Sequence, residues 1–263
     1  MNAPSDLARA ARYTIPFVLL LILLWGTAVN NIVPDPYLDE VFHVGQAQKY
    51  WAHNWKYWDQ KITTPPGLYL WSYALCTVLQ SLCGSLIDIG AAELRATNVL
   101  AAAVILPWRL QTLLDHLRRE QNSRPVGAWV SHTVLNICLF PPLFFFSALY
   151  YTDILALVFV VESYIWDSRR SNDAAGRQSW PSILLGHASI KASIFLLFSL
   201  AALLFRQTNI FWVAVFLGGL QITHVLHEVS TPCRVADFSD VVKKGLQNEL
   251  YDPPIADASI VGG

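Results

Sequence analysis

The feature of the sequence that most constrains its fold is an uncharged and mostly apolar run at residues 13–33. As a helix this run is about 31 Å long, which is enough to cross the hydrocarbon core of a bilayer. The chain has 54% hydrophobic and 14% charged residues, whereas soluble domains carry about 25% charged residues. A cleaved signal peptide is the alternative for this run, but no clear cleavage motif follows it. We therefore expect a membrane protein.

The basic residues indicate how the chain crosses the membrane. Arg9 and Arg12 precede the first apolar run, which places the N-terminus in the cytosol. The segments 116–124 and 167–177 are also basic. They too fall in the cytosol if the apolar stretch 68–87 lies along the luminal membrane face instead of crossing the bilayer. We expect this arrangement.

This topology predicts an all-α, polytopic membrane protein with five parts. They are a cytosolic N-terminus (1–12), a first transmembrane helix (13–33), a first luminal loop with surface helices (34–94), a bundle of about five spans (95–227), and a cytosolic tail or truncated loop (228–263). Within the bundle, proline at positions 141 and 142 predicts a bend or break, because proline interrupts a helix.

The first luminal loop contains a polar stretch, residues 35–67, with the candidate catalytic residues. Asp35-Pro36 has the pattern of an N-cap followed by proline at the first helical position. On such a helix Asp39 and His43 share a face with Gln46 and Tyr50, and Glu40 lies three residues before His43.

The predicted topology gathers most strong polar groups outside the cytosolic loops on the luminal side. These groups are Asp39, Glu40, His43, Lys61, Arg95, Asp153 and Arg206. A carboxylate beside cationic groups suits a reaction in which a base deprotonates a hydroxyl while the cations hold an anionic leaving group. The alternatives are structural: an acidic helix start, interface-anchoring arginines, and tryptophans of the membrane belt.

Three charged residues fall inside predicted spans. Glu162 needs a partner or a wet cavity at that depth. Lys191 and Arg109 lie close enough to span ends for their charges to reach the membrane surface.

No Asp-x-Asp pair, metal-ligand cluster or glycine-rich phosphate loop occurs in the sequence. We therefore expect no metal and no cofactor, and no nucleic-acid partner.

Several long motifs resemble a known family. They are YLDEVFH at 37–43, WDQKITTPPGLY at 58–69, RATN at 95–98, FFFSALYYTD at 144–153 and FRQTNI at 205–210. In this order, from about residue 13 to residue 212, they are similar to the endoplasmic-reticulum dolichyl-phosphoglucose-dependent α-1,2-glucosyltransferases, which add the last glucose to the lipid-linked oligosaccharide for N-glycosylation.

The resemblance implies a GT-C helical bundle in which an acidic residue of the first luminal loop, Asp39 or Glu40, acts as the catalytic base. It implies dolichyl phosphate glucose as donor, the diglucosylated dolichyl diphosphate oligosaccharide as acceptor, and an inverting, metal-independent transfer on the luminal side of the endoplasmic-reticulum membrane. Substrate-binding residues would be His43, Lys61, Arg95, Asp153, Arg206, Gln207 and Asn209.

Family members are longer than this chain, so it resembles their N-terminal part, and part of the donor-lipid groove is expected to lie elsewhere. The alternatives are a related transferase that uses dolichyl phosphate mannose, an inactive fragment, or a transporter or regulatory membrane subunit. A transporter predicts an internal repeat, and none is visible.

Overall fold

The computed structural model describes residues 13–84, 88–120, 127–175, 190–229 and 246–247. Every regular element among these residues is a helix, so the predicted all-α class is confirmed. The chain divides into two compact units, residues 1–213 and 214–263, and each is described by itself. The candidate site lies in the first unit.

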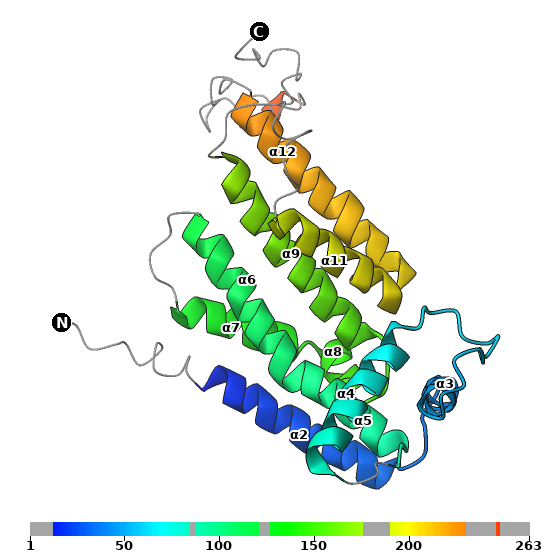
Figure 1. The fold of residues 1–263 in the computed structure, drawn as a ribbon. Coiled ribbons are helices and arrows are strands. Elements are labelled where there is room, and N and C mark those ends of the chain that lie inside the picture. Colours follow the sequence, from blue (N-terminus) through cyan, green and yellow to red (C-terminus); the bar gives the residue numbers. More distant parts are fainter. Residues whose placement is uncertain (1–12, 85–87, 121–126, 176–189, 230–245, 248–263) are drawn as a thin grey trace. The chain divides into compact units, whose positions relative to one another are not determined.

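Figure 1 colours the helices of the first unit in chain order. They are α2 (Thr14–Ile32), α3 (Glu40–Trp51), α4 (Gly67–Cys83), α5 (Ala91–Leu100), the π-helical turn η1 (Ala101–Ile105), α6 (Leu106–Glu120), α7 (Gly127–Cys138), α8 (Pro141–Phe146), α9 (Asp153–Ala175), α11 (Ile190–Phe205) and the 3-10 turn η2 (Gln207–Asn209). The π-helical turn η3 (Phe211–Phe216) leads into the second unit, where α12 spans Leu217–Val229.

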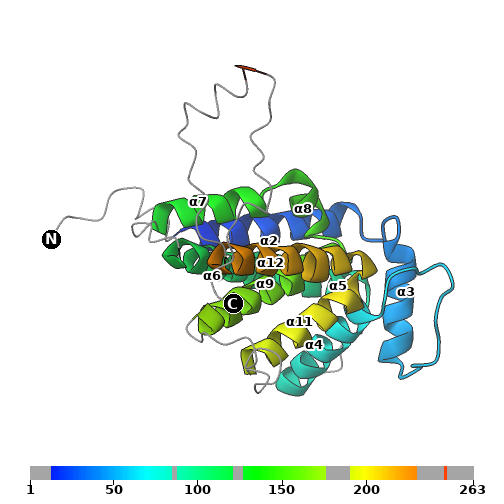
Figure 2. The same ribbon diagram turned by 90° about the horizontal axis from the view of Figure 1, so that it is seen from above.

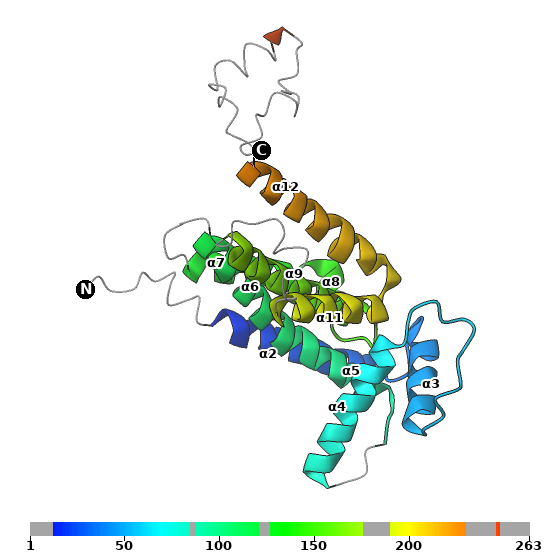
Figure 3. The same ribbon diagram turned by 45° about the horizontal axis from the view of Figure 1, so that its top comes forward.

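In the first unit α9 packs against both α6 and α11, and α6 also contacts α7. Helix α2 packs along α5, η1 and α7 (Figure 2). Apolar side chains such as Leu106, Ile154, Leu155 and Ile165 are fully buried between these helices. The first turn of α4 lies beside the C-terminal end of α11, while α3 contacts α4 and α5 (Figure 3).

Within the described ranges, two helices are long and apolar enough to cross a membrane. One is Ile15–Ile32, which coincides with the predicted first span, and the other is the continuous helix Ala91–Leu117. A shorter apolar helix spans Ile190–Phe205. The predicted break at Pro141 is also observed, because α7 ends at Cys138 and α8 begins at Pro141.

The helix start predicted at Asp35-Pro36 is wrong, because α3 begins at Glu40. Leu38 has a positive φ of 53°, which no helix accommodates. The Asp35 carbonyl accepts a hydrogen bond from Arg95, and the Tyr37 N–H donates to the Glu40 carboxylate. These contacts hold the chain in a turn where the local sequence favours a helix.

The apolar stretch predicted at 68–87 forms α4 up to Cys83 and ends at Gly84, which adopts the left-handed conformation with φ 63°. That conformation is the usual helix stop for glycine. Residues 85–87 lie outside the described part of the chain. Placement of this stretch along the membrane stays a prediction.

Candidate active site

Glu40, at the start of α3, is fully buried in an ion pair with Arg95 of α5. The side chains are both 0% exposed. The Arg95 guanidinium donates in bidentate fashion, Nε to Glu40 Oε1 at 3.0 Å and Nη2 to Oε2 at 2.6 Å. This fork geometry is the strongest form of carboxylate–arginine hydrogen bonding.

The remaining hydrogen-bonding groups of this ion pair are also occupied by the protein. Glu40 accepts further hydrogen bonds from the backbone N–H of Tyr37 at 2.9 Å and of Tyr150 at 2.6 Å. Arg95 donates to the side chain of Asn30 and to the carbonyls of Val33 and Asp35. The pair thus joins the end of α2, the start of α3, α5 and the segment before α9. In this structure both charges face the protein interior.

Asp39 differs from its neighbour Glu40, because its side chain is exposed. It is the N-cap residue of α3. Its backbone N–H donates to the hydroxyl of Tyr151 at 3.0 Å. Of the two carboxylates in the predicted acidic pair, Asp39 is therefore the one that solvent and a substrate can reach.

His43 lies one helical turn after Asp39 and is buried. Its Nδ1 is hydrogen-bonded to the Tyr69 hydroxyl at 2.7 Å, and its ring meets the Tyr151 ring edge-on at 5.8 Å. Burial lowers the pKa of His43 below its ordinary 6.5, against the opposing effect of the nearby carboxylates, chiefly Asp39. At neutral pH the imidazole is uncharged, so it suits hydrogen bonding better than it suits holding a phosphate.

Asp153 and Arg206 form a second ion pair, and this one is open to solvent. Asp153 begins α9 and Arg206 follows α11, and their side chains are 30% and 45% exposed. Asp153 also acts electrostatically on His43 and Tyr151, as does Asp39. The structure therefore brings Asp39, His43, Asp153 and Arg206 to one region, with Tyr151 among them.

The other predicted substrate-binding residues lie differently. Lys61 is exposed, with its ammonium group over the Phe42 ring at 5.1 Å from the centroid. Gln207 is exposed. Asn209 is buried, and its amide donates to the carbonyl of Ala202 in the last turn of α11, which is a structural contact.

Of the predicted shared face, His43, Gln46 and Tyr50 lie on the buried face of α3, whereas Asp39 before its first turn is exposed. Gln46 is almost completely buried, and its side chain donates to the Tyr57 carbonyl and accepts from the Asp59 N–H. These bonds fix the loop that presents the exposed rings of Trp55 and Trp58. Tyr69, Gln46 and Tyr151 were not among the predicted site residues, although the first and last stand inside the matched motifs.

Glu162 has the partner that its predicted depth requires. It forms an ion pair with Arg109, whose Nη2 donates to Glu162 Oε2 at 2.8 Å. Arg109 is thus bound to a carboxylate of α9, and the expectation that its charge reaches the membrane surface stays a prediction.

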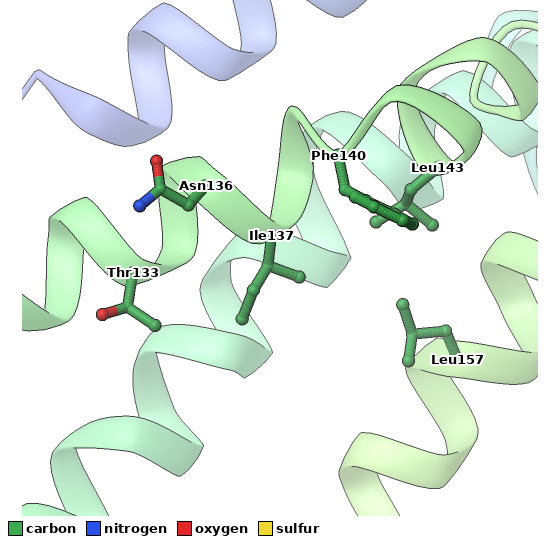
Figure 4. Close-up of a pocket in the computed structure, with 6 residues that line it drawn as sticks. All are labelled: Thr133, Asn136, Ile137, Phe140, Leu143 and Leu157. Carbon is green, nitrogen blue, oxygen red and sulfur yellow. The ribbon is translucent and has the colours of Figure 1, made fainter.

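An apolar groove lies away from these polar groups, where α7, α8 and α9 meet (Figure 4). Its volume is about 440 Å³, and it is lined by Thr133, Asn136, Ile137, Phe140, Leu143 and Leu157. None of the predicted site residues lines it. Among the described residues, no group of three or more His, Cys, Asp or Glu side chains is placed to hold a metal ion.

In the part of the chain that the structure describes, every regular element is a helix and two helices are long and apolar enough to cross a bilayer, as is typical of helical membrane proteins. The chain belongs to the DIE2/ALG10 family, whose model matches residues 33–249. The family resemblance seen in the motifs is thereby confirmed.

Three curated relatives share one name, Dol-P-Glc:Glc(2)Man(9)GlcNAc(2)-PP-Dol alpha-1,2-glucosyltransferase. The relative from Aspergillus fumigatus is 58% identical over 97% of this chain and 40% of its own length. The relative from Emericella nidulans is 56% identical over 99% of this chain and 41% of its own length, and one from Gibberella zeae is 41% identical over 91% and 34%. The chain thus spans about two fifths of the length of the first two of these relatives and about a third of the length of the last. No solved structure matches it.

Proposed function

We propose that the protein transfers glucose from dolichyl phosphate glucose, in α-1,2 linkage, to the diglucosylated dolichyl diphosphate oligosaccharide. The observation that carries this proposal is an exposed carboxylate, Asp39, and an exposed cation, Arg206, in one region of a chain that is 58% identical to a transferase of that name. Asp39 and the Arg206 partner Asp153 both act electrostatically on His43. Base and cation are the two groups that such a transfer requires.

In the proposed reaction Asp39 is the general base. Its carboxylate takes the proton from the 2-hydroxyl of the acceptor's terminal glucose as that oxygen attacks C1 of the donor glucose. The bond from C1 to the phosphate oxygen breaks, and dolichyl phosphate leaves with that electron pair. One in-line displacement inverts the β-linked donor to an α-linked product without a covalent intermediate.

Glu40 and Arg95 have a structural role in this proposal. A carboxylate that already accepts hydrogen bonds from Arg95, Tyr37 and Tyr150 cannot accept a substrate proton without breaking a buried ion pair. Breaking such a pair costs about 3–5 kcal/mol. The neighbouring Asp39 carries no such cost.

Arg206 is the candidate to hold the donor phosphate. Its ion pair with Asp153 is exposed, so a phosphate can replace the carboxylate at small cost. Lys61 and Gln207 are exposed and suit substrate contacts, and the exposed rings of Trp55 and Trp58 suit the apolar faces of sugars.

For the complete protein we propose a GT-C-like, multi-pass arrangement in the endoplasmic-reticulum membrane with the site in the lumen. Residues 34–94 form the first luminal loop, α4 lies along the membrane face, and residues 95–227 carry the further spans. Glycosylation tags introduced at Asn54 and at Asn122 test this topology. Modification of the Asn54 tag alone is expected, and modification of both would contradict the placement of α4.

The catalytic proposal is tested with Asp39→Asn and Glu40→Gln in the longest protein that the gene encodes, assayed in microsomes with labelled dolichyl phosphate glucose and acceptor. Asp39→Asn should lower the rate per folded molecule by about 10²- to 10⁴-fold, the usual contribution of a general base. Glu40→Gln should instead lower the amount of folded protein. A wild-type rate in Asp39→Asn removes the base assignment.

The alternative function, a related transferase that uses dolichyl phosphate mannose, is tested in the same microsomes. Unlabelled dolichyl phosphate glucose should suppress the labelled transfer, whereas dolichyl phosphate mannose at the same concentration should leave it unchanged. Competition by the mannose donor alone would favour the related transferase.

A further inference from the structure

Tyr151 is a buried tyrosine in the segment between α8 and α9, and it lies directly against the start of α3. Its ring packs between the rings of Phe146, at 5.1 Å, and His43, at 5.8 Å. The hydroxyl of a tyrosine is protonated at neutral pH, so that of Tyr151 can donate a hydrogen bond as well as accept one.

The hydroxyl of Tyr151 bridges the two residues on either side of Leu38. It accepts the hydrogen bond from the Asp39 N–H at 3.0 Å and donates to the Tyr37 carbonyl at 3.4 Å. Between them Leu38 has a φ of 53°, a left-handed conformation that costs a bulky residue free energy. Such a conformation persists only where surrounding contacts determine it, and this hydroxyl supplies two of those contacts.

The backbone that carries Tyr151 is itself fixed. The Asn98 side chain donates to the carbonyls of Leu149 and Tyr151, at 2.8 and 2.6 Å. The Tyr150 N–H donates to buried Glu40. Glu40 thus fixes the segment of residues 149–151, and this segment contacts the Asp39 backbone through the Tyr151 hydroxyl. The direction of the exposed Asp39 carboxylate therefore depends on buried contacts.

We propose that Tyr151 is a positioning residue for Asp39: its hydroxyl holds the Tyr37–Asp39 turn in the one geometry that aims the carboxylate at the acceptor hydroxyl. The inference rests on the proposed role of Asp39 as base. General bases need their proton donor within hydrogen-bond reach, and a misplacement of about 1 Å can cost about 100-fold in rate.

The first test is Tyr151→Phe, which removes the hydroxyl and keeps the ring. We expect kcat per folded molecule to fall about 10- to 100-fold, with KM for donor and acceptor unchanged. The matched control is Tyr150→Phe, the same change at the preceding position, whose hydroxyl bonds only to Ser72 and Leu68 in the described structure. The control should lower thermal stability and leave kcat per folded molecule near wild type. A wild-type kcat in Tyr151→Phe overturns the inference.

A second test separates positioning from a general loss of folding. Asparagine adopts the left-handed conformation more readily than leucine does, so Leu38→Asn should restore part of kcat to Tyr151→Phe. In an Asp39→Glu background, whose carboxylate is already displaced, Tyr151→Phe should cost much less than in wild type. An undiminished cost there, or no rescue by Leu38→Asn, contradicts positioning.

The two proposals fail in different ways. Substantial activity in Asp39→Asn removes the base and the proposed function of this residue, whatever Tyr151 does. Loss of activity in Asp39→Asn together with full kcat in Tyr151→Phe removes only the inference about Tyr151.

Discussion

Two ion pairs of similar chemistry stand in very different surroundings in this molecule. Glu40 and Arg95 are fully buried, whereas Asp153 and Arg206 are 30% and 45% exposed. Buried charges are stable only when every partner is supplied by the protein, and exposed pairs exchange readily with water and ions. The difference gives the buried pair a structural role and leaves the exposed pair available to a ligand.

The same contrast separates two adjacent residues. Asp39 and Glu40 are next to each other in the sequence, yet one side chain is exposed and the other has no exposed surface. The turn at Leu38 directly precedes the two residues, and the contacts of Glu40 with Arg95 and with the Tyr150 N–H enclose only the second of them.

The largest effect is expected where the buried pair is broken. Arg95→Met leaves Glu40 charged and unpaired inside the protein, which should lower the free energy of unfolding by about 3–5 kcal/mol. The measurement is thermal unfolding of the detergent-solubilised protein, with Arg95→Met combined with Glu40→Leu as control. Because the double variant leaves no buried charge, it should be more stable than Arg95→Met alone. Wild-type stability in Arg95→Met would place Glu40 in contact with solvent and reopen it as a base.

A smaller loss of stability is expected at Gly67, where the start of α4 contacts the end of α11 close to Arg206. A Cβ added at Gly67 would lie 2.5 Å from the backbone oxygen of Leu204, two residues before Arg206. Since backbone cannot move aside as a side chain does, Gly67→Ala should cost about 1–3 kcal/mol of stability. The control is Gly45→Ala within α3, where a Cβ meets nothing within 4 Å. It should stabilise the protein by about 0.5–1 kcal/mol. Equal effects of the two changes would show that α4 and α11 are not tightly joined.

A pH-dependent effect is expected at His43, between the two regions. Burial lowers its folded pKa below the unfolded value of 6.5, so the unfolded state binds a proton first as the pH falls. The His43 contribution to stability is therefore constant above pH 6.5 and declines below it, until the pH reaches the lowered folded pKa. Thermal unfolding at pH 7.5 and pH 5.5 measures this change. His43→Gln should lose less stability between these two pH values than wild type, and an equal loss would exclude a lowered pKa.

Much of the fold was predictable because its signals are local. The uncharged run at 13–33 predicted α2, and prolines at 141 and 142 predicted the break between α7 and α8. These features depend on side-chain hydrophobicity and on a missing backbone N–H, both of which the sequence displays directly. The family motifs likewise indicated the region of the site.

The division of roles within the site depends on residues far apart in the chain. Arg95 lies 55 residues after Glu40, and Tyr150 lies 110 residues after it. Local spacing could not show which of two neighbouring carboxylates they enclose. The incorrect helix start at Asp35 has the same cause, because a contact to Arg95 outweighs a local capping preference worth about 1 kcal/mol.

The smallest effect on stability is expected at the exposed pair of Asp153 and Arg206, where the two substitutions should change the KM for the donor differently. Asp153→Asn and Arg206→Gln should each change the free energy of unfolding by less than about 1 kcal/mol, because solvent screens both charges. Arg206→Gln should raise the KM for dolichyl phosphate glucose, since it removes the proposed phosphate contact. Asp153→Asn should leave that KM unchanged or lower it, because it removes the carboxylate that competes with the phosphate for Arg206. Steady-state kinetics in microsomes and thermal unfolding in detergent give both quantities for each variant. Stability losses as large as that of Arg95→Met would instead give the exposed pair a structural role, and the contrast between the two ion pairs would no longer separate structure from function.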